Sequence, residues 1–491
     1  MNRHRWLIGV LFGLFWSNGL ITEGRQSSAQ AHPASNEALA SPASEKASPV
    51  SLEVNGTPYD ALAAFHDVVV ESQVNDSYFG LAFDVNGDGL IDVVRSGLGV
   101  PAGSAGRSTT TGWPLNDDLG EVVWYENPSW RKHVIARLSV PVGLHYGDVD
   151  GDGYTDLFVS HDYALCIFNC KPGDGRVSWL RNPGPAGGEW SRFPIGDLMA
   201  THRLRYGNFG DKGGPGLLAF PIVGGVGGAI HEPVNITLYQ PPNDVLTATT
   251  WPFSVVSSNL RVVHGDSALP AASNQTASVL VASEEGIAQL SRPETGGPWR
   301  ETRLSAGETQ STRGTLAEWK GSGDVDVGRI GTNPMAYIVA LEPFHGASLV
   351  IYTKAADARG EDQWQRHLLD RFDHTTAATA EGPGHHVLTG DFDGDGDDEF
   401  LVALRGPAPY SGVFYYKVRD IKNLKVNKQR VSSASASRLA AADFNRDGRL
   451  DFASVPYVVA TYYRAEDARV MVYINQFANR KQMGSALPTK P

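Results

Sequence analysis

Residues 385–404 read HHVLTGDFDGDGDDEFLVAL, which is an apolar segment, an acidic glycine-containing turn and a second apolar segment in direct succession. An apolar run that enters such a turn and leaves it as another apolar run is typical of two antiparallel strands joined by a hairpin. The pattern occurs seven times along the chain, twice in degenerate form. The copies start at or near Tyr78, Val142, His202, Arg261, Thr315, His385 and Ser437.

A third apolar or aromatic segment follows each of these pairs. The third segments begin near residues 122, 177, 235, 287, 348, 412 and 470. Their spacing of about 58 residues suits a four-stranded blade with long loops. The sequence therefore predicts an all-β fold, a seven-bladed β-propeller.

The two ends of the repeat array complement each other. The last repeat ends at Phe477 without a fourth strand, whereas residues 65–71 (FHDVVVE) form a strand ahead of the first repeat. We expect strand 65–71 to pair with the segment near 470–476 and complete the last blade, because this closure removes an exposed sheet edge.

The amino terminus has the features of a secretory signal. Arg3 and Arg5 precede a short apolar run, residues 7–16, and Ala29-Gln30-Ala31 is a small-x-small cleavage site. The run is shorter than the roughly 20 apolar residues of a membrane span, so we expect export to the periplasm or the extracellular space and no membrane span. The expected segments are a signal peptide (1–31), a flexible linker (32–55), the propeller (56–480) and a disordered tail (481–491).

The net charge limits the classes of partner, and the cysteine content limits the possible disulfide and metal sites. The formal net charge is -12, which argues against a nucleic-acid partner because nucleic-acid binding needs a clustered basic face. The only cysteines, Cys166 and Cys170, can form a small disulfide loop in an oxidising compartment. A metal-binding pair and two free thiols are the alternatives. A homodimer is compatible with the sequence.

Four of the turns carry oxygen-bearing side chains at alternate positions, with a glycine after the third. The side chains are Asp84, Asn86, Asp88 and Asp92; Asp148, Asp150, Asp152 and Asp156; Asp391, Asp393, Asp395, Asp397 and Glu399; and Asp443, Asn445, Asp447 and Asp451. The position that usually offers a backbone carbonyl is held by Leu90, Tyr154, Asp397 and Arg449. Alternating oxygens around a tight turn suit one hard cation, Ca²⁺ or Mg²⁺.

These loops resemble the compact hairpin calcium loops of integrin-like repeats. We expect their ions to be structural. The alternative is an Asp/Asn-rich hairpin turn without an ion, and the loop from Asp443 to Asp451 fits this best because Arg446 and Arg449 reduce its negative charge.

Histidines cluster where the innermost strands begin and the second strands end, which is one mouth of the central channel. We expect a polar funnel formed by His145, His161, His202, His264, Glu342, His345, His385 and His386. Each of them alone could be an ordinary hydrogen-bonded side chain. Together they suit a borderline cation such as zinc, or general acid–base catalysis near neutral pH. We expect no role for His66, His133, His367 and His374, which fall on outer strands or loops.

Several longer stretches resemble a known family. They are WKGSGDVDVGR (319–329), LEPFHG (341–346), EGPGHH (381–386) and GDFDGDGDDEFLVALRGP (390–407). They are similar to aldos-2-ulose dehydratase, a fungal enzyme also called pyranosone or 1,5-anhydro-D-fructose dehydratase. The similarity runs from about residue 75 to residue 477.

The resemblance implies a seven-bladed propeller, bound divalent metals and a hydro-lyase that removes water from a keto-sugar such as 1,5-anhydro-D-fructose or an aldos-2-ulose. The fungal enzyme also carries cupin domains after the propeller, associated with a later isomerisation. We expect this chain to correspond to the propeller portion without the cupin domains.

The resemblance also suggests roles for the funnel residues. Zinc or another divalent metal would be held by some of His202, His264, Glu342, His345 and His386. The catalytic candidates are His145 or His385 as the base, with His202, His386, Lys320 and Arg405; the substrate-binding candidates are Arg205, His161, Glu342 and His345. Two alternatives are a propeller polysaccharide lyase that acts beside a uronate and a non-catalytic integrin-like binding module.

Overall fold

The structure is a computed structural model. It describes residues 64–99, 119–163, 166–167, 170–269, 278–293, 297–315, 317–356, 362–376, 379–459 and 462–477. The expected signal peptide (1–31), linker (32–55) and tail (481–491) lie outside these residues. No helix in the described part of the chain is long and apolar enough to cross a membrane.

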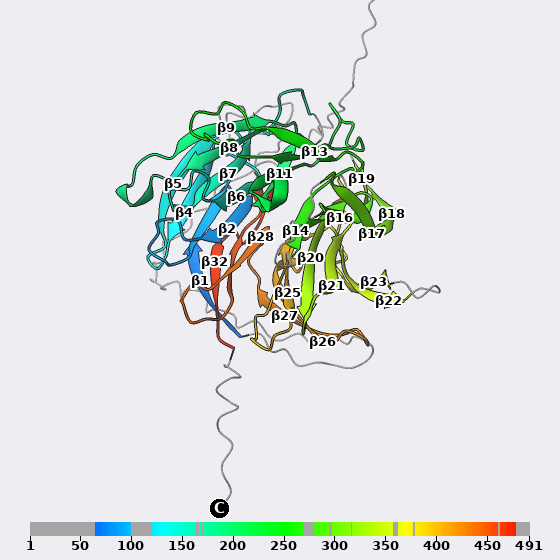
Figure 1. Ribbon diagram of the computed structural model, residues 1–491. Coiled ribbons are helices and arrows are strands. Elements are labelled where there is room, and N and C mark those ends of the chain that lie inside the picture. The colour runs from blue at the N-terminus through cyan, green and yellow to red at the C-terminus, as the bar shows by residue number, and fades with distance from the viewer. Residues whose placement is uncertain are drawn as a thin grey trace, which may run out of the picture. The chain divides into compact units, whose positions relative to one another are not determined.

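Seven four-stranded antiparallel sheets form a ring in the described residues, and each sheet is one blade (Figure 1). The first three blades are β2 (Phe79–Phe83), β3 (Asp92–Ser96), β4 (Gly120–Glu126) and β5 (Arg131–Leu138); β6 (Leu144–Gly147), β7 (Asp156–His161), β8 (Arg176–Arg181) and β9 (Ser191–Asp197); and β10 (Thr201–Gly207), β11 (Gly216–Pro221), β12 (Ile236–Tyr239) and β13 (Phe253–Ser257). Blades 4 and 5 are β14 (Gly265–Leu269), β15 (Ser278–Ser283), β16 (Gly286–Ser291) and β17 (Arg300–Ser305), and β20 (Asp324–Ile330), β21 (Asn333–Glu342), β22 (Ser348–Ala356) and β23 (Asp362–Arg371). Blades 6 and 7 are β24 (Gly384–Gly390), β25 (Glu399–Arg405), β26 (Ser411–Asp420) and β27 (Lys425–Ser432), and β28 (Arg438–Ala442), β29 (Asp451–Val455), β32 (Val470–Asn475) and β1 (Phe65–Glu71). The predicted seven-bladed propeller is confirmed.

Blade 7 is built from both ends of the array. Strand β1 pairs antiparallel with β32, so that Phe65 lies opposite Asn475 and Val68 opposite Val472. Strand β28 in turn packs against β2 of the first blade. The predicted closure by strand 65–71 is therefore confirmed.

Two short hairpins interrupt the regular repeat. Strands β18 (Glu308–Arg313) and β19 (Glu318–Gly321) stand between blades 4 and 5, and β30 (Val458–Val459) and β31 (Tyr463–Arg464) are inserted within blade 7. The repeat pattern did not predict these hairpins because they occur only once each.

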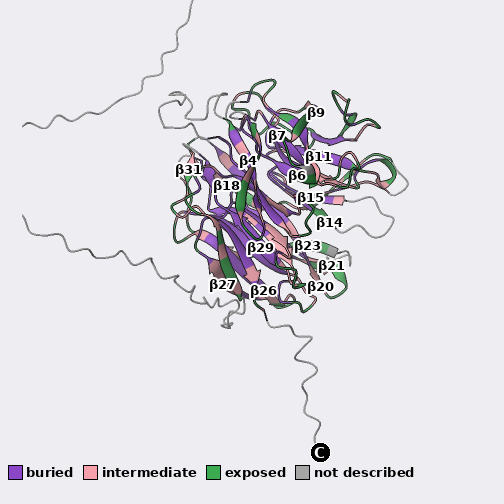
Figure 2. Ribbon diagram, turned by 90° about the vertical axis from the view of Figure 1, so that its left-hand side faces the viewer, coloured by how far each residue is buried: buried purple, intermediate pink, exposed green. Residues whose placement is uncertain are grey.

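The hydrophobic core lies between neighbouring blades. The second strands carry a buried apolar run, such as residues 157–159 of β7 and 400–404 of β25, and Figure 2 shows buried residues at the centre of the sheets. Val339 and Ile351 of blade 5, for example, pack with Phe400 and Val402 of blade 6. Each such side chain contributes roughly 1.5–3 kcal/mol by leaving water.

Three of the acidic loops also tie one blade to the previous one. In blade 2, the carboxylate of Asp156 accepts hydrogen bonds from the backbone N–H groups of Val149 (2.9 Å) and Asn182 (2.8 Å). The side-chain amide of Asn182 donates to the carbonyl of Val85 in blade 1 (2.8 Å). The pairs Asp92–Asn127 and Asp451–Asn475 repeat this arrangement. These contacts hold neighbouring blades together without any ion.

The acidic loops and the histidines lie at opposite ends of the innermost strands. Strand β24 has His385 near its start and runs into Asp391 at its end. Seven extended residues span roughly 20 Å, so the histidine end and the loop end are well separated, as the sequence predicted.

Candidate functional site

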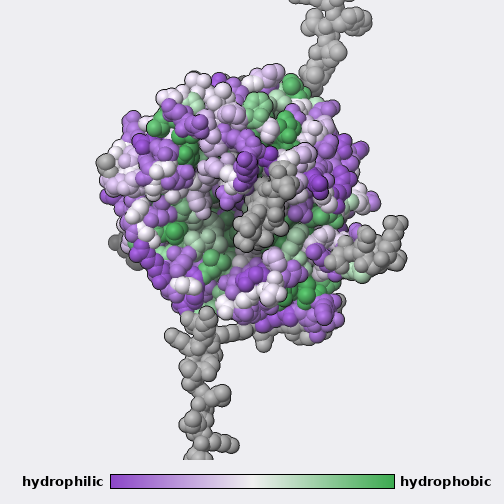
Figure 3. Space-filling model, viewed as in Figure 1, coloured by the Kyte–Doolittle hydropathy of each residue, from purple (hydrophilic) through white to green (hydrophobic). Residues whose placement is uncertain are grey.

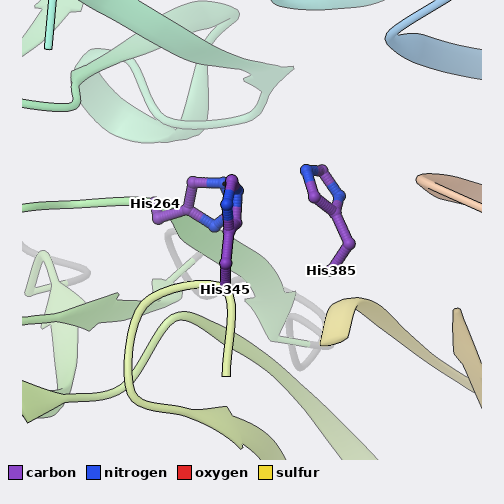
Figure 4. Close-up of side chains that lie close together, drawn as sticks. All are labelled: His264, His345 and His385. Carbon is purple, nitrogen blue, oxygen red and sulfur yellow. Dashed lines mark hydrogen bonds between the residues drawn. The ribbon is translucent and has the colours of Figure 1, made fainter. Parts of the chain in front are cut away.

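Three imidazoles from three blades meet at the inner edge of the ring (Figure 4). His264 lies just before β14, His345 follows β21, and His385 belongs to β24. One ring nitrogen from each lies within 4.8 Å of those of the other two. All three residues are at most 5% exposed, so this triad is enclosed by protein.

Each imidazole of the triad is held through its Nδ1 atom. His264 Nδ1 lies 2.8 Å from the carbonyl of Gly323, and His385 Nδ1 lies 2.6 Å from the carbonyl of Ser437. His345 Nδ1 lies 2.8 Å from a carboxylate oxygen of Glu381. Because carbonyls and carboxylates only accept, all three Nδ1 atoms carry hydrogen, and the neutral rings keep lone pairs on Nε2.

The Nε2 atoms of the triad have the arrangement that a metal ion requires. Those of His264 and His345 are 3.1 Å apart, although neither carries a hydrogen to share. Nε2 of His385 is buried and has no hydrogen-bond partner among the described residues. Imidazoles anchored through Nδ1, with lone pairs on Nε2, form the usual donor set for zinc, so these residues fit a divalent ion.

The triad is uncharged at neutral pH. Burial, reinforced by neighbouring charged groups, holds the pKa values of His264 and His385 well below the usual range. Burial also lowers the pKa of His345 to about 4, although the charge of Glu381 opposes this. Neutral imidazole is the form that binds metal ions.

Glu381 is the buried carboxylate behind His345. It also accepts hydrogen bonds from Arg405 (2.8 Å) and from the hydroxyl of Tyr462. Burial by itself would raise the pKa of Glu381, but His345 and Arg405 outweigh it and lower the pKa to about 2. The carboxylate is therefore charged, and it fixes the orientation of the His345 ring.

A fourth histidine lies beside the triad. The ring centroid of His202 is 5.0 Å from that of His264, and its Nε2 atom lies 2.6 Å from the hydroxyl of Tyr78. The guanidinium of Arg203 lies 3.2 Å from Nε2 of both His202 and His264. An ion bound by the triad would replace the bond between Arg203 and His264.

His202 and His345 line a small cavity beside the triad. The side chains that line it are aromatic, imidazole or aliphatic: Tyr78, Leu98, Val142, Tyr163, Ile167, His202, Ile222, Phe344, His345, Tyr457, Val459 and Tyr462. No lysine, arginine, aspartate or glutamate is among the described lining residues. The space-filling view shows mainly hydrophilic side chains on one face of the ring, which is hollowed at its centre (Figure 3). The cavity therefore suits a small uncharged polar molecule.

The structure separates the predicted funnel residues into two groups. It brings His202, His264, His345 and His385 together, with Arg405 reaching them through Glu381. The proposed ligand Glu342 instead lies in a buried ion pair with Arg366 (2.7 Å). His386 is not part of the triad, and its imidazole accepts a hydrogen bond from the backbone N–H of Leu439.

The remaining predicted residues also have other partners. Arg205 is paired with Asp266, and His145 lies 3.2 Å from the carbonyl of Tyr146. His161 lies 2.9 Å from the hydroxyl of Ser178. Lys320 is exposed and lies 3.4 Å from Glu284. None of these side chains lines the cavity.

Known proteins resemble large parts of this chain. A family model for the β-propeller domain of aldos-2-ulose dehydratase matches residues 174–355, and an FG-GAP-like repeat matches residues 391–454. The aldos-2-ulose dehydratase of Phanerodontia chrysosporium is 32% identical over 438 residues, which cover 84% of this chain and 46% of that protein. This propeller is related to that of aldos-2-ulose dehydratase. The present chain spans about half the length of this dehydratase.

Solved structures show more distant likenesses to this dehydratase-related propeller. The periplasmic gluconolactonase PpgL of Pseudomonas aeruginosa is 16% identical with a TM-score of 0.42, over 72% of this chain and 85% of that chain. An Agrocybe aegerita lectin that recognises non-reducing terminal N-acetylglucosamine is 12% identical with a TM-score of 0.42, over 82% and 87%.

Several residues of the site were missed by the sequence analysis. Glu381 and Phe344 stand inside two of the stretches that resemble aldos-2-ulose dehydratase, EGPGHH and LEPFHG, which was the available signal. Tyr457 and Tyr462 come from the loop that carries the inserted hairpin of blade 7. Since this hairpin has no counterpart in the described residues of the other blades, the repeat could not indicate them.

Proposed function

We propose that this propeller is a dehydratase that removes water from a small uncharged keto-sugar such as 1,5-anhydro-D-fructose or an aldos-2-ulose. The observation that carries the proposal is the uncharged histidine triad beside a cavity lined by four tyrosines. Hydroxyl and imidazole groups suit the hydroxyls of a sugar, and the relationship to aldos-2-ulose dehydratase supports the same chemistry.

His264, His345 and His385 would hold a divalent metal, with zinc as the preferred candidate. A bound ion would act as a Lewis acid toward the ketone oxygen and make the neighbouring C–H more acidic. Glu381 keeps His345 in the required orientation, and Arg405 and Tyr462 hold Glu381 in place. These contacts belong to the chain itself and keep the donor atoms in position.

Tyr78 and His202 are the groups we assign to proton transfer. Their 2.6 Å hydrogen bond lets a proton pass between the phenol and the imidazole. The pair would take the proton from the carbon next to the ketone and return it to the hydroxyl on the following carbon. The C–H and C–O bonds break, a C=C bond forms, and one water molecule leaves.

The alternatives are less well supported. A lyase acting on a uronate would need a free lysine or arginine against the substrate carboxylate, and none lines the cavity among the described residues. The nearest guanidinium groups, those of Arg405 and Arg203, are directed at Glu381 and at two histidines. A non-catalytic binding module would give the buried, converging imidazoles no function.

The test is formation of the conjugated enone, followed by ultraviolet absorbance after mixing the protein with 1,5-anhydro-D-fructose and zinc. We expect turnover by the wild type and its loss in His345→Ala. The matched control is His367→Ala, since His367 lies on outer strand β23 with Thr353 as its partner. The proposal is abandoned if the zinc-loaded wild type forms no enone from this sugar or from an aldos-2-ulose.

We also infer a structural role for cations in the acidic loops of blades 1, 2 and 7, and export of the chain. Alternating carboxylates such as Asp148, Asp150 and Asp156 converge within 4.8 Å and offer the oxygen donors that Ca²⁺ or Mg²⁺ prefers. Cys166 and Cys170 form a disulfide, which supports an oxidising compartment such as the periplasm or the extracellular space.

A further inference from the structure

The acidic loop of blade 6 differs from the other three. Its last acidic residue is Glu399, where the other loops end in aspartate. It also lacks the asparagine that ties the other loops to the previous blade, because Val418 stands at that position of the third strand. Hydrogen bonds from the backbone N–H groups of Arg329 and Gly331 to Asp398 and Asp397 tie this loop to blade 5 instead.

Lys417 of strand β26 is a further feature that the other acidic loops lack. Its ammonium group donates hydrogen bonds to Asp393, to Asp395 at 2.7 Å and to Glu399 at 2.9 Å. These are three of the side chains that the sequence pattern assigned to a metal ion. The nitrogen atom thus lies where the cation was expected.

The ammonium group is fixed in this position by burial. Lys417 is 4% exposed, and Asp393 and Glu399 are 7% and 1% exposed. Burial opposes its positive charge, but the hydrogen bonds to the carboxylates outweigh this and raise the pKa of Lys417 above its usual value. The ammonium group is therefore largely shielded from solvent.

The corresponding position in the other blades holds no such lysine. Tyr416 pairs with Phe400, so Lys417 stands opposite Glu399, and the equivalent residues are Glu126, Arg181 and Ile474. Arg181 reaches Asp150 (2.5 Å) and Asp152 (2.8 Å), but its side chain is 38% exposed and can turn outward. Only Lys417 is both basic and enclosed at this position.

We propose that Lys417 is the permanent cation of the blade 6 loop and that this loop binds no metal ion. Calcium would need the same oxygens at about 2.3–2.6 Å, which would place a divalent ion against the ammonium group. The calcium-type site predicted at Asp391–Glu399 does not fit the residues present. Strands β24 and β25, which carry His385 and Arg405, are then joined without a divalent ion.

The experiment counts calcium ions bound per chain by elemental analysis after equilibration with calcium and removal of the excess. The wild type is compared with Lys417→Met and with the control Lys422→Met, whose lysine is exposed. We expect Lys417→Met to bind one more calcium ion than the other two, because it removes the ammonium group from Asp393, Asp395 and Glu399. We also expect calcium to raise the melting temperature of this variant more than that of the wild type.

A second measurement covers the case in which Lys417→Met does not fold. Crystals of the wild type grown with calcium should show no anomalous calcium peak at the blade 6 loop. A peak between Asp393 and Glu399 in the wild type overturns the proposal, as does a folded Lys417→Met chain that binds no additional ion. Neither measurement depends on dehydratase activity.

Discussion

Nδ1 of His345 lies 2.8 Å from Oε2 of Glu381, and both side chains are almost completely buried. This contact joins the triad to a second layer made of Arg405 and Tyr462. A carboxylate behind a histidine ligand fixes the ring and increases its basicity, and its removal typically costs 10–100-fold in metal affinity. We expect Glu381→Gln to weaken zinc binding by about 10–100-fold, measured by competition with a chromophoric chelator.

The same substitution should change the dependence of stability on pH. Because the folded pKa of Glu381 is about 2, below its usual 4.5, its contribution is complete above pH 4.5 and is lost as the pH falls towards 2. Glu381→Gln should therefore melt at a lower temperature than the wild type at pH 7, and the difference should shrink as the pH falls through this range. The exposed residue Glu189 provides the control, Glu189→Gln; a difference that stays constant with pH would contradict the assignment.

A second prediction concerns Tyr78. Tyr78→Phe removes the hydroxyl that bonds to His202 but keeps the ring that lines the cavity. If the pair transfers the proton, kcat should fall by about 100-fold or more while KM and the zinc content change little. Tyr146→Phe, an exposed tyrosine, is the control. Unchanged kcat in Tyr78→Phe would remove this residue from the mechanism.

A third prediction uses two neighbouring histidines. His385 belongs to the triad, whereas His386 accepts a hydrogen bond from the backbone of Leu439. His385→Ala should lose the bound zinc, and His386→Ala should retain it, because only His385 contributes a nitrogen atom to the triad. The zinc content of both variants is measured by elemental analysis after dialysis. Retention of zinc by His385→Ala would mean that the ion is held elsewhere.

A fourth prediction addresses the contacts between blades. Asn182→Ala removes the amide that bonds to the carbonyl of Val85 in blade 1, which leaves a buried acceptor unsatisfied. We expect a loss of about 1–3 kcal/mol in the free energy of unfolding, measured by denaturant titration with and without calcium. The exposed Asn208 provides the control, Asn208→Ala. An equally small effect of both substitutions would show that the contact adds no stability.

The propeller could be predicted from the sequence because its strands are encoded locally. Each blade repeats the same order of apolar run, turn and apolar run, and the strand starting at Phe65 had no partner other than the incomplete last blade. The placement of His264 and His345 followed from the same argument, since the ends of inner and second strands meet at one mouth of the ring.

The details of the site could not be predicted because they depend on side-chain direction and on unique loops. His385 and His386 are adjacent, and only the register of β24 decides which of them faces the triad. Glu342 lies at the right strand end but turns toward Arg366. Glu381 lies in a connection between two blades, where no periodic pattern exists. Lys417 acts at a distance of about 20 residues from the loop it neutralises.

The pairing of Phe65 with Asn475 joins residues about 400 positions apart. Contacts between such distant residues form slowly, because a long chain must be ordered before they can be made. During synthesis, the first strand must remain unpaired until almost the whole array has been produced. The ring is therefore closed by one pairing between distant strands. The rate at which the folded ring unfolds depends on how often β1 detaches from β32.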